Sequence, residues 1–313
     1  MRAYVGLTDW SWYENLRAAG ATEANFWRPR DLRRFGRSVP QGAPFLFKAH
    51  KDRGDRILGG GFFDGWVTLT IERAWEFFGP GNGARSVTEL LAAISAIRGE
   101  QVTAQTEIGC ILLSQVRFFP WDDAPSAPPD WAGNLVQGRS YELGTPDGSY
   151  VEEVFAQLLA RDLADEETVL PGVVDGPVFG AHRLMAQRLG QAPFKALVQE
   201  AYGRRCAITG ERIVPVLEAA HIRPVASAGE NRVDNGLLLR SDVHTLFDRG
   251  YLGVHPEKRT VRVSPRLRRD FGNGEEFYAM QSSGRTIAAP QRRADRPHRE
   301  FLEWHADEVF LSA

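Results

Sequence analysis

Residues 213–249 carry a pattern that few folds satisfy. An apolar segment, 213–222, is followed by a polar loop and then by a second apolar segment, 237–240. Ser241 comes directly after it and offers an N-cap for a short helix over 241–249. Apolar runs of this length between turn-forming residues are typical of strands. The sequence therefore predicts a long-looped β-hairpin that leads straight into a helix.

Polar side chains recur at fixed places in this pattern. His221 ends the first predicted strand, Asn235 follows it by 14 positions, and His244 follows Asn235 by 9. Because residues four apart share one face of a helix, His244 and Asp248 face the same point. An imidazole and a carboxylate so placed are potential metal ligands.

The residues of this stretch resemble the ββα-metal core of HNH endonucleases. The resemblance is carried by Ala219-Ala220-His221-Ile222-Arg223-Pro224, by Asn235-Gly236-Leu237-Leu238-Leu239 and by His244-Thr245-Leu246-Phe247-Asp248-Arg249-Gly250, and it extends over 192–313. Taken singly, each histidine is more simply explained as a structural residue, but the order and spacing together favour the nuclease. The resemblance implies hydrolysis of phosphodiester bonds in double-stranded DNA.

The resemblance also implies a role for each polar residue. Phosphodiester hydrolysis needs a deprotonated water and a cation that absorbs charge on the phosphate. His221 is then the general base, and His244 binds a single divalent ion, Mg²⁺ or Mn²⁺. Asn235 braces the loop, orients His221 or supplies an oxygen ligand. Asp248 is the second predicted ligand, with a plain helix-terminal charge as the alternative.

Two positions depart from the family pattern. Many members carry Asp or His just before the base, where this chain has Ala220, and Glu218 is a candidate substitute. Many members also fold around two pairs of cysteines, whereas this chain has only Cys110 and Cys206. We therefore expect no structural zinc and two buried thiols.

The formal net charge of −2 hides an uneven distribution of charge. Residues 192–313 carry 19 Lys/Arg against 16 Asp/Glu, whereas 150–191 carry 3 against 7. Arginines in the basic part could hold DNA phosphates, although a solvated charged surface is the more common reason for such a run. The predicted phosphate contacts are Arg223, Arg249, Arg266, Arg268 and Arg269.

The first part of the chain predicts a separate α+β domain. Short apolar strands alternate with Gly- and Pro-marked turns, and Ser86 with Glu89 forms a capping box for a helix over 86–97. A helix over 150–163 and an acidic, turn-rich stretch follow. We predict a barrel-like domain over 1–145, an acidic helical linker over 146–191 and the nuclease domain over 192–313.

The first domain resembles EVE and other PUA-like domains, which are small β-barrels with helices. The resemblance is carried by Asn25-Phe26-Trp27-Arg28-Pro29, Phe45-Leu46-Phe47-Lys48, Gly59-Gly60-Gly61-Phe62-Phe63 and Ala74-Trp75-Glu76-Phe77-Phe78-Gly79. It implies an aromatic pocket for a flipped, modified base, because stacking on aromatic rings offsets the cost of extruding that base. Trp27, Asn25 and Trp121 are the predicted wall, and core packing is the alternative for each tryptophan.

Together the two halves predict a modification-dependent, type IV-like restriction endonuclease. It would cut phage DNA that carries methyl-, hydroxymethyl- or glucosylated cytosine. One HNH core cuts one strand, so a homodimer is expected for a double-strand break. The alternatives are an HNH nuclease that reads another mark, such as phosphorothioate, or plain sequence, and a non-cleaving binder of modified nucleic acid. Nothing resembles a secretory signal or a membrane span, so we expect a cytoplasmic protein.

Overall fold

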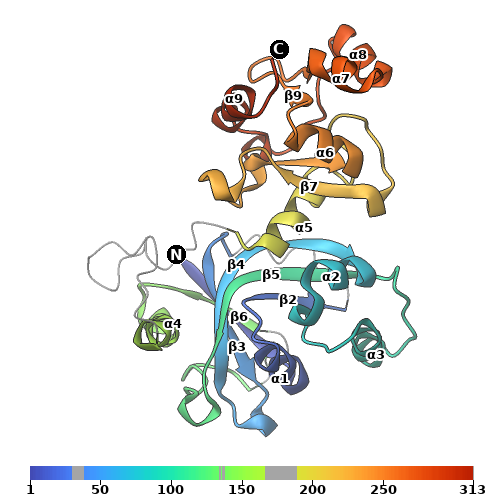
Figure 1. Cartoon of the computed structure of the whole chain (residues 1–313). Coiled ribbons are helices and arrows are strands. Elements are labelled where there is room, and N and C mark those ends of the chain that lie inside the picture. Colours follow the sequence, from blue (N-terminus) through green and yellow to red (C-terminus); the bar gives the residue numbers. More distant parts are fainter. Residues whose placement is uncertain (30–38, 134, 136–137, 166–188, 313) are drawn as a thin grey trace. The chain divides into compact units, whose positions relative to one another are not determined.

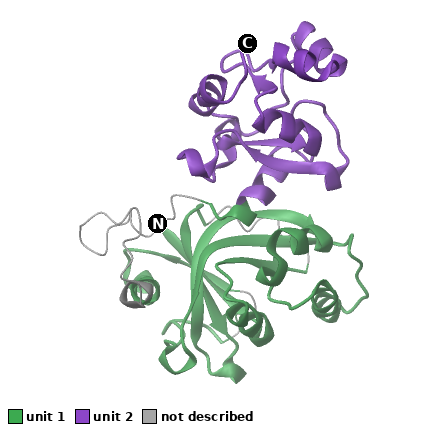
Figure 2. Ribbon diagram, viewed as in Figure 1, with its two compact units in different colours: residues 1–193 green, residues 194–313 purple. Residues whose placement is uncertain are grey.

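The computed structural model describes residues 1–29, 39–133, 135, 138–165 and 189–312 of the chain. The chain divides into two compact units, Met1–Pro193 and Phe194–Ala313 (Figure 2). Helix α5 (Gln191–Ala201) contains the boundary between them. Within the described ranges, no helix combines the length and the apolar character needed to cross a membrane.

Unit 1 is built on one six-stranded sheet with the strand order β2-β5-β4-β3-β1-β6 (Figure 1). Strands β1 and β3 are parallel, and the other neighbours are antiparallel. Because β2 and β6 stand at the two ends of this order, the strands that the structure describes form no closed barrel. The predicted PUA-like barrel is therefore not confirmed. The strands are β1 (Arg2–Thr8), β2 (Glu23–Arg28), β3 (Ala43–Ala49), β4 (Ile57–Thr70), β5 (Glu107–Phe118) and β6 (Gly138–Glu142).

The side chains of β3 belong alternately to two core clusters, one on each face of the sheet. Phe45 and Phe47 belong to a core cluster that includes residues of α1 (Trp10–Ala18). Leu46, between them, belongs to a second cluster with residues of α4 (Pro146–Asp165). Since successive side chains of a strand point to opposite faces, the two helices cover opposite faces of the sheet. The whole of β3 is accordingly buried.

Helix α4, at the start of the predicted linker, packs in the core of unit 1. Its side chains Val151, Phe155 and Leu158 are buried in the second core cluster, so this helix is part of unit 1. An amphipathic helix pattern predicts a buried face but does not tell which core that face joins. Residues 166–188 of the predicted linker lie outside the described residues.

Two further helices of unit 1 follow β4, α2 (Ile71–Phe78) and α3 (Val87–Arg98). The predicted cap of α3 is confirmed, since the Ser86 hydroxyl accepts a hydrogen bond from the Glu89 N–H at 3.2 Å. The Glu89 carboxylate accepts from the backbone N–H of Arg85 at 3.0 Å, one residue before the position that the capping box predicts.

Unit 2 combines two small hairpins with helices, so the chain as a whole is α+β. Strands β7 (Leu217–His221) and β8 (Gly236–Arg240) form the first hairpin, and α6 (Ser241–Asp248) follows β8 without a loop. The N-cap of α6 is Arg240 in an extended conformation, so Ser241 is the first helical residue and not the cap. The remaining elements are β9 (Leu252–Val254), β10 (Val261–Val263), α7 (Pro265–Phe271), α8 (Glu275–Ser282) and α9 (Arg299–Glu308).

Candidate active site

The β7–β8 hairpin places His221 at the end of a strand, opposite Gly236. A Cβ atom at Gly236 would lie 2.6 Å from a methyl group of Val198 and 3.1 Å from the Phe194 ring, both on α5. Gly236 thus lets α5 approach the hairpin closely. The Phe194 ring stacks on the His221 ring with centroids 4.1 Å apart.

His221 is partly buried and makes a hydrogen bond through one ring nitrogen. Its Nε2 lies 2.8 Å from Oδ1 of Asn231, in the loop between β7 and β8. Burial lowers the pKa of His221 below its ordinary value, and the bond to Asn231 opposes this shift. His244 also lowers the pKa, whereas Asp248 raises it. A histidine of this kind is neutral at physiological pH, as a general base must be.

His244, on α6, lies between two carboxylates. Its Nδ1 is 2.6 Å from Oε2 of Glu218 on β7, and its Nε2 is 3.2 Å from Oδ2 of Asp248. The hydrogen bond to Asp248 raises the pKa of His244, burial opposes this, and Glu218 adds to the rise. The predicted convergence of His244 and Asp248 on one face of the helix is thus present in the structure.

Asn235 is fully buried, and its side chain closes the long loop of the hairpin. Its Oδ1 accepts the backbone N–H of Arg223, and its Nδ2 donates to the carbonyl oxygens of Arg223 and Glu230, all at 2.9 Å. Of the three roles predicted for Asn235, this geometry corresponds to the loop brace. The amide is thus tied to the backbone of the loop, and the role of its oxygen as a metal ligand stays a prediction.

The position before His221 packs in the core, because Ala220 is fully buried and pairs with Leu237. Glu218, two residues earlier, reaches the same histidine as Asp248 but on the opposite ring nitrogen. A metal-binding histidine commonly gives its second ring nitrogen to a carboxylate. Glu218 therefore suits the orientation of His244 better than the replacement of a ligand at Ala220.

The fit of a divalent ion depends on the donors near His244. Among the described residues, no group of three or more His, Cys, Asp or Glu side chains is arranged to hold a metal. His244 Nε2 and Asp248 Oδ2 are 3.2 Å apart, close to the spacing of two adjacent ligands that each lie about 2.1 Å from one ion. Mg²⁺ often takes only one or two protein ligands and completes its shell with water and substrate phosphate. The pair therefore fits a site of that kind.

The arginines predicted to contact phosphate differ in the contacts that they already make within the protein. On α7, Arg266 and Arg269 contact Asp270, and Arg268 contacts Glu275, at 2.8 to 3.2 Å. Arg223 donates to the Ser227 carbonyl at 2.6 Å and lies over the Trp304 ring. Arg249 is the C-cap of α6 and is exposed.

The three residues predicted to contact a modified base lie apart. Trp27 on β2 pairs with Cys110 near the start of β5, whereas Trp121 follows the end of β5. Asn25 is fully buried, and its Nδ2 donates to Asn82 at 2.9 Å and lies 3.3 Å from the Cys110 sulfur. The structure therefore does not bring Asn25, Trp27 and Trp121 together as one pocket wall.

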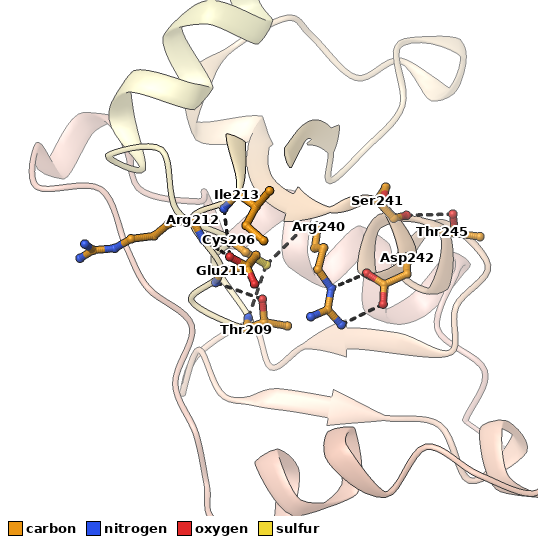
Figure 3. Close-up of polar contacts among 9 residues, drawn as sticks. All are labelled: Cys206, Thr209, Glu211, Arg212, Ile213, Arg240, Ser241, Asp242 and Thr245. Atoms are coloured by element: carbon orange, nitrogen blue, oxygen red, sulfur yellow. Dashed lines mark hydrogen bonds and ion pairs between the residues drawn. The ribbon is translucent and has the colours of Figure 1, made fainter. Parts of the chain in front are cut away.

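Cys206 shows how the start of the nuclease region is held. Its buried sulfur accepts the backbone N–H groups of Thr209 and Arg240, both at 3.4 Å (Figure 3). The Glu211 carboxylate accepts the backbone N–H groups of the two residues that follow it, Arg212 at 2.6 Å and Ile213 at 2.9 Å. Hydrogen bonds from the backbone thus shape the turn that leads into the hairpin.

Two residues that contact His221 are not marked by the sequence pattern. Phe194 lies before the predicted hairpin, and Asn231 lies in its polar loop. Their distances from His221 along the chain follow no helix or strand period, so no local pattern marks them. The one available signal was the position of Asn231 in the loop that the Asn235 motif closes.

Comparison with known proteins identifies this region. Residues 206–255 match the family model described as HNH endonuclease. The chain therefore contains an HNH endonuclease domain, and it is a DNA endonuclease. No curated protein matches the chain.

Two solved structures show a weak likeness. A mutant of the ZmASCH protein from Zymomonas mobilis is 10% identical, with 49% of this chain and 97% of that chain covered and a TM-score of 0.30. The modification-dependent restriction endonuclease TagI is 12% identical, with 92% of this chain and 75% of that chain covered and a TM-score of 0.26. At these TM-scores, neither likeness assigns a fold or a function to this chain.

Proposed function

We propose that this endonuclease cuts DNA at the site formed by His221 and His244, and that unit 1 restricts cutting to DNA with modified cytosine. The observation that carries the catalytic part is a contrast between two histidines on one hairpin and helix. The pKa of His221 is lowered by burial, whereas the pKa of His244 is raised by Asp248 and Glu218. The His221 ring is thereby suited to accept a proton, and the two carboxylates beside His244 attract a cation to that ring.

In this proposal His221 is the general base. Its neutral ring takes a proton from the water that attacks the phosphorus atom. Burial against Phe194 keeps the ring neutral between turnovers. Asn235 holds the loop that follows His221 through the backbone of Arg223, so the base is carried by a rigid segment.

His244 and Asp248 would hold one divalent ion, Mg²⁺ or Mn²⁺, per site. When bound, that ion supplies positive charge to the scissile phosphate and the leaving oxygen. Glu218 accepts the Nδ1 proton of His244 and thereby leaves Nε2 as the nitrogen for the ion. The protein's contribution is to fix the tautomer and the direction of His244.

Two partly buried tryptophans of unit 1 support base recognition. The Trp27 indole N–H donates to the Asn82 carbonyl at 2.9 Å, which fixes the plane of the ring. Trp121 packs edge-on against Trp10, and the Arg56 guanidinium lies over its ring. We propose each ring as a stacking surface for a base, with Asn25 supporting β2 behind Trp27 and not lining the pocket.

The DNA backbone and the subunit arrangement complete the proposal. Exposed Arg249, one residue after Asp248, is the best placed of the predicted phosphate contacts. The α7 arginines would have to exchange carboxylate partners for phosphate.

One active site cuts one strand, so we propose that two copies of the chain act together on double-stranded DNA.

Matched plasmids test this function. They would carry cytosine, methylcytosine, hydroxymethylcytosine or glucosylated hydroxymethylcytosine and would be incubated with Mg²⁺ or Mn²⁺. We expect cutting of modified plasmids only. Equal cutting of all four would indicate a nuclease that reads plain sequence. Neither binding nor cutting of any of the four would indicate a nuclease that reads another mark, such as phosphorothioate. Binding of modified DNA without any cutting would indicate a non-cleaving binder.

Single tryptophan variants test the reader. Loss of a base–aromatic stack costs about 1–3 kcal/mol, so Trp27→Ala or Trp121→Ala should weaken binding of modified DNA by roughly 5- to 150-fold. Trp75→Ala, a matched change on α2, is the control. Binding of unmodified DNA should change little, because it depends on phosphate contacts and falls with salt. If neither variant discriminates between the two DNAs, unit 1 does not read a base through these rings.

A further inference from the structure

The contact between His221 and Asn231 fixes the position of a proton. An amide oxygen can only accept a hydrogen bond, so His221 Nε2, 2.8 Å from Asn231 Oδ1, must donate. A neutral imidazole carries one ring proton. With that proton on Nε2, Nδ1 is the unprotonated and basic nitrogen of His221.

We propose that Asn231 is the positioning residue of the general base: its side-chain oxygen holds His221 in the Nε2-protonated tautomer and reserves Nδ1 for the proton of the attacking water. This inference rests on the proposed function, in which His221 is the base. Asn231 does not touch the substrate in this proposal and acts only through His221.

The two loop asparagines, Asn231 and Asn235, have different roles. Asn235, the family motif residue, donates to the carbonyl of Glu230, the residue directly before Asn231. It thereby fixes the backbone from which the Asn231 side chain reaches His221. Asn235 itself makes its side-chain hydrogen bonds to Arg223 and Glu230 and none to the histidine ring. Orientation of the base therefore falls to Asn231.

A second constraint acts on the same ring. The Phe194 and His221 planes are inclined by only 13°, so stacking fixes the plane of the imidazole while Asn231 fixes its rotation within that plane. The charged groups that influence His221 come from two helices. Lys195 on α5 and His244 on α6 lower its pKa, whereas Asp248 on α6 raises it. Asn231 is the neutral partner among them, so it directs the ring without adding charge.

Three variants of the full chain test the proposal. Asn231→Ala removes the acceptor. Asn231→Asp keeps an oxygen at the same place but adds a negative charge. Asn273→Ala makes the matched change at an exposed asparagine between α7 and α8. The first readout is nitrogen NMR of the chain labelled with ¹⁵N-histidine, with the His221 signals assigned from a His221→Gln variant. The second is the single-turnover rate of plasmid cleavage as a function of pH, at saturating Mn²⁺.

We expect His221 to be protonated at Nε2 in the wild type and in Asn231→Asp, and to become a mixture of tautomers in Asn231→Ala. Cleavage by Asn231→Ala should fall about 10-fold or more, with DNA affinity unchanged, because a disordered base loses part of its catalytic effect. Asn231→Asp should recover most of the rate at high pH. The acid limb of its pH profile should move up by about one pH unit, because a carboxylate stabilises the imidazolium.

An Asn231→Ala protein with an unchanged His221 tautomer and an unchanged pH profile overturns the proposal. So does an Asn231→Asp profile that does not move, since a purely structural asparagine would lose rate without shifting the profile. Failure of the proposed function looks different. In that case His221→Ala would still cut, whatever the tautomer measured by NMR.

Discussion

The rings of Phe194 and His221 stack with their centroids 4.1 Å apart. Phe194 is fully buried, so its ring is a fixed surface against which the histidine rests. Burial is the largest cause of the lowered pKa of His221. The aromatic stack therefore contributes both the orientation of the base and its neutrality.

Phe194→Leu should move the pKa of His221 up toward its ordinary value, because the smaller side chain lets water reach the imidazole. The acid limb of the cleavage profile should then move to higher pH. We expect a rate several-fold lower at pH 6 and little change at pH 8. Phe277→Leu, a matched change at a buried position on α8, controls for the loss of about 1–2 kcal/mol of packing. Equal profiles for the two variants would show that the stack does not tune the base.

His221→Ala should lower the single-turnover cleavage rate by about 100-fold or more, the usual contribution of a general base. DNA affinity should stay within twofold of the wild type, because the phosphate contacts are made by other residues. A filter-binding or anisotropy titration beside the cleavage assay separates the two quantities. Undiminished cutting would assign the base to a different residue.

Metal affinity should follow the arrangement around His244. Asp248→Asn and His244→Ala remove proposed ligands, and Glu218→Gln removes the carboxylate that orients the ring. We expect Glu218→Gln to weaken Mn²⁺ binding by about 10-fold or more, the usual effect of losing such a partner. Asp242→Asn is the matched control, because Asp242 also lies on α6 but pairs with Arg240 (Figure 3). Calorimetry that gives one affinity for all four variants would remove this group from the metal site.

Comparison of the hairpin with its prediction shows what a sequence pattern can specify. The end of the first strand at His221, the helix and the face shared by His244 and Asp248 follow from local periodicity, and the structure contains them. The first strand begins at Leu217 and not at residue 213, because Val214–Val216 form a 3-10 helix. The predicted N-cap was wrong by one residue, because β8 turns into α6 at Arg240 without a side-chain cap. The contact between Asn231 and His221 depends on how a polar loop folds back, which no period encodes.

Unit 1 shows a second limit of prediction from sequence. Asn25 and Trp27 stand two apart on β2 and look alike as candidates for a pocket. In the structure Asn25 is fully buried with Asn82, whereas Trp27 is only partly buried. The pairing of β2 with β5, which joins residues far apart in the sequence, decides this burial. Non-local pairing also leaves β2 and β6 at the edges of the sheet. The pattern of residues within a strand does not predict which strands pair.

His305 should make the nuclease domain sensitive to acid. It is buried, stacks on Phe247 and has its Nε2 3.1 Å from the Phe247 carbonyl oxygen. Burial lowers its pKa from 6.5 to about 4. The unfolded chain therefore binds a proton before the folded chain does, and stability present above pH 6.5 is lost as pH falls to about 4. The loss approaches about 3 kcal/mol.

Hydrogen exchange of α9 measures this local stability. The opening free energy of α9 should fall between pH 7 and pH 5 in the wild type, after correction for the intrinsic exchange rate. His305→Phe should reduce this dependence, because phenylalanine does not titrate. The Phe247 carbonyl keeps a hydrogen-bond partner in this variant, since it also accepts the Gly250 N–H at 3.0 Å. His298→Gln, at the exposed N-cap of α9, should leave it unchanged. A pH dependence that survives in His305→Phe would assign the titration to another group.

Asp64 should give unit 1 a pH dependence of the opposite sign. It is the extra residue in a bulge of β4, between Phe63 and Gly65, and it is only 2% exposed. Burial raises the pKa of this carboxyl to about 7, although the Gly190 N–H donates to it at 3.0 Å. Ionisation is therefore easier in the unfolded chain. Stability that is present below pH 3.8 is lost as pH rises to about 7, by up to about 4 kcal/mol.

Asp64→Asn removes this titration while keeping an amide oxygen that accepts the Gly190 N–H. We expect the variant to be more stable than the wild type at pH 8 and about equally stable at pH 4, as measured by hydrogen exchange of β4 peptides. Asp52→Asn, at an exposed position after β3, should change neither value. If Asp64→Asn instead destabilises unit 1 at pH 8, the charged carboxylate contributes more through Gly190 than its burial costs, and the sign argued here is wrong.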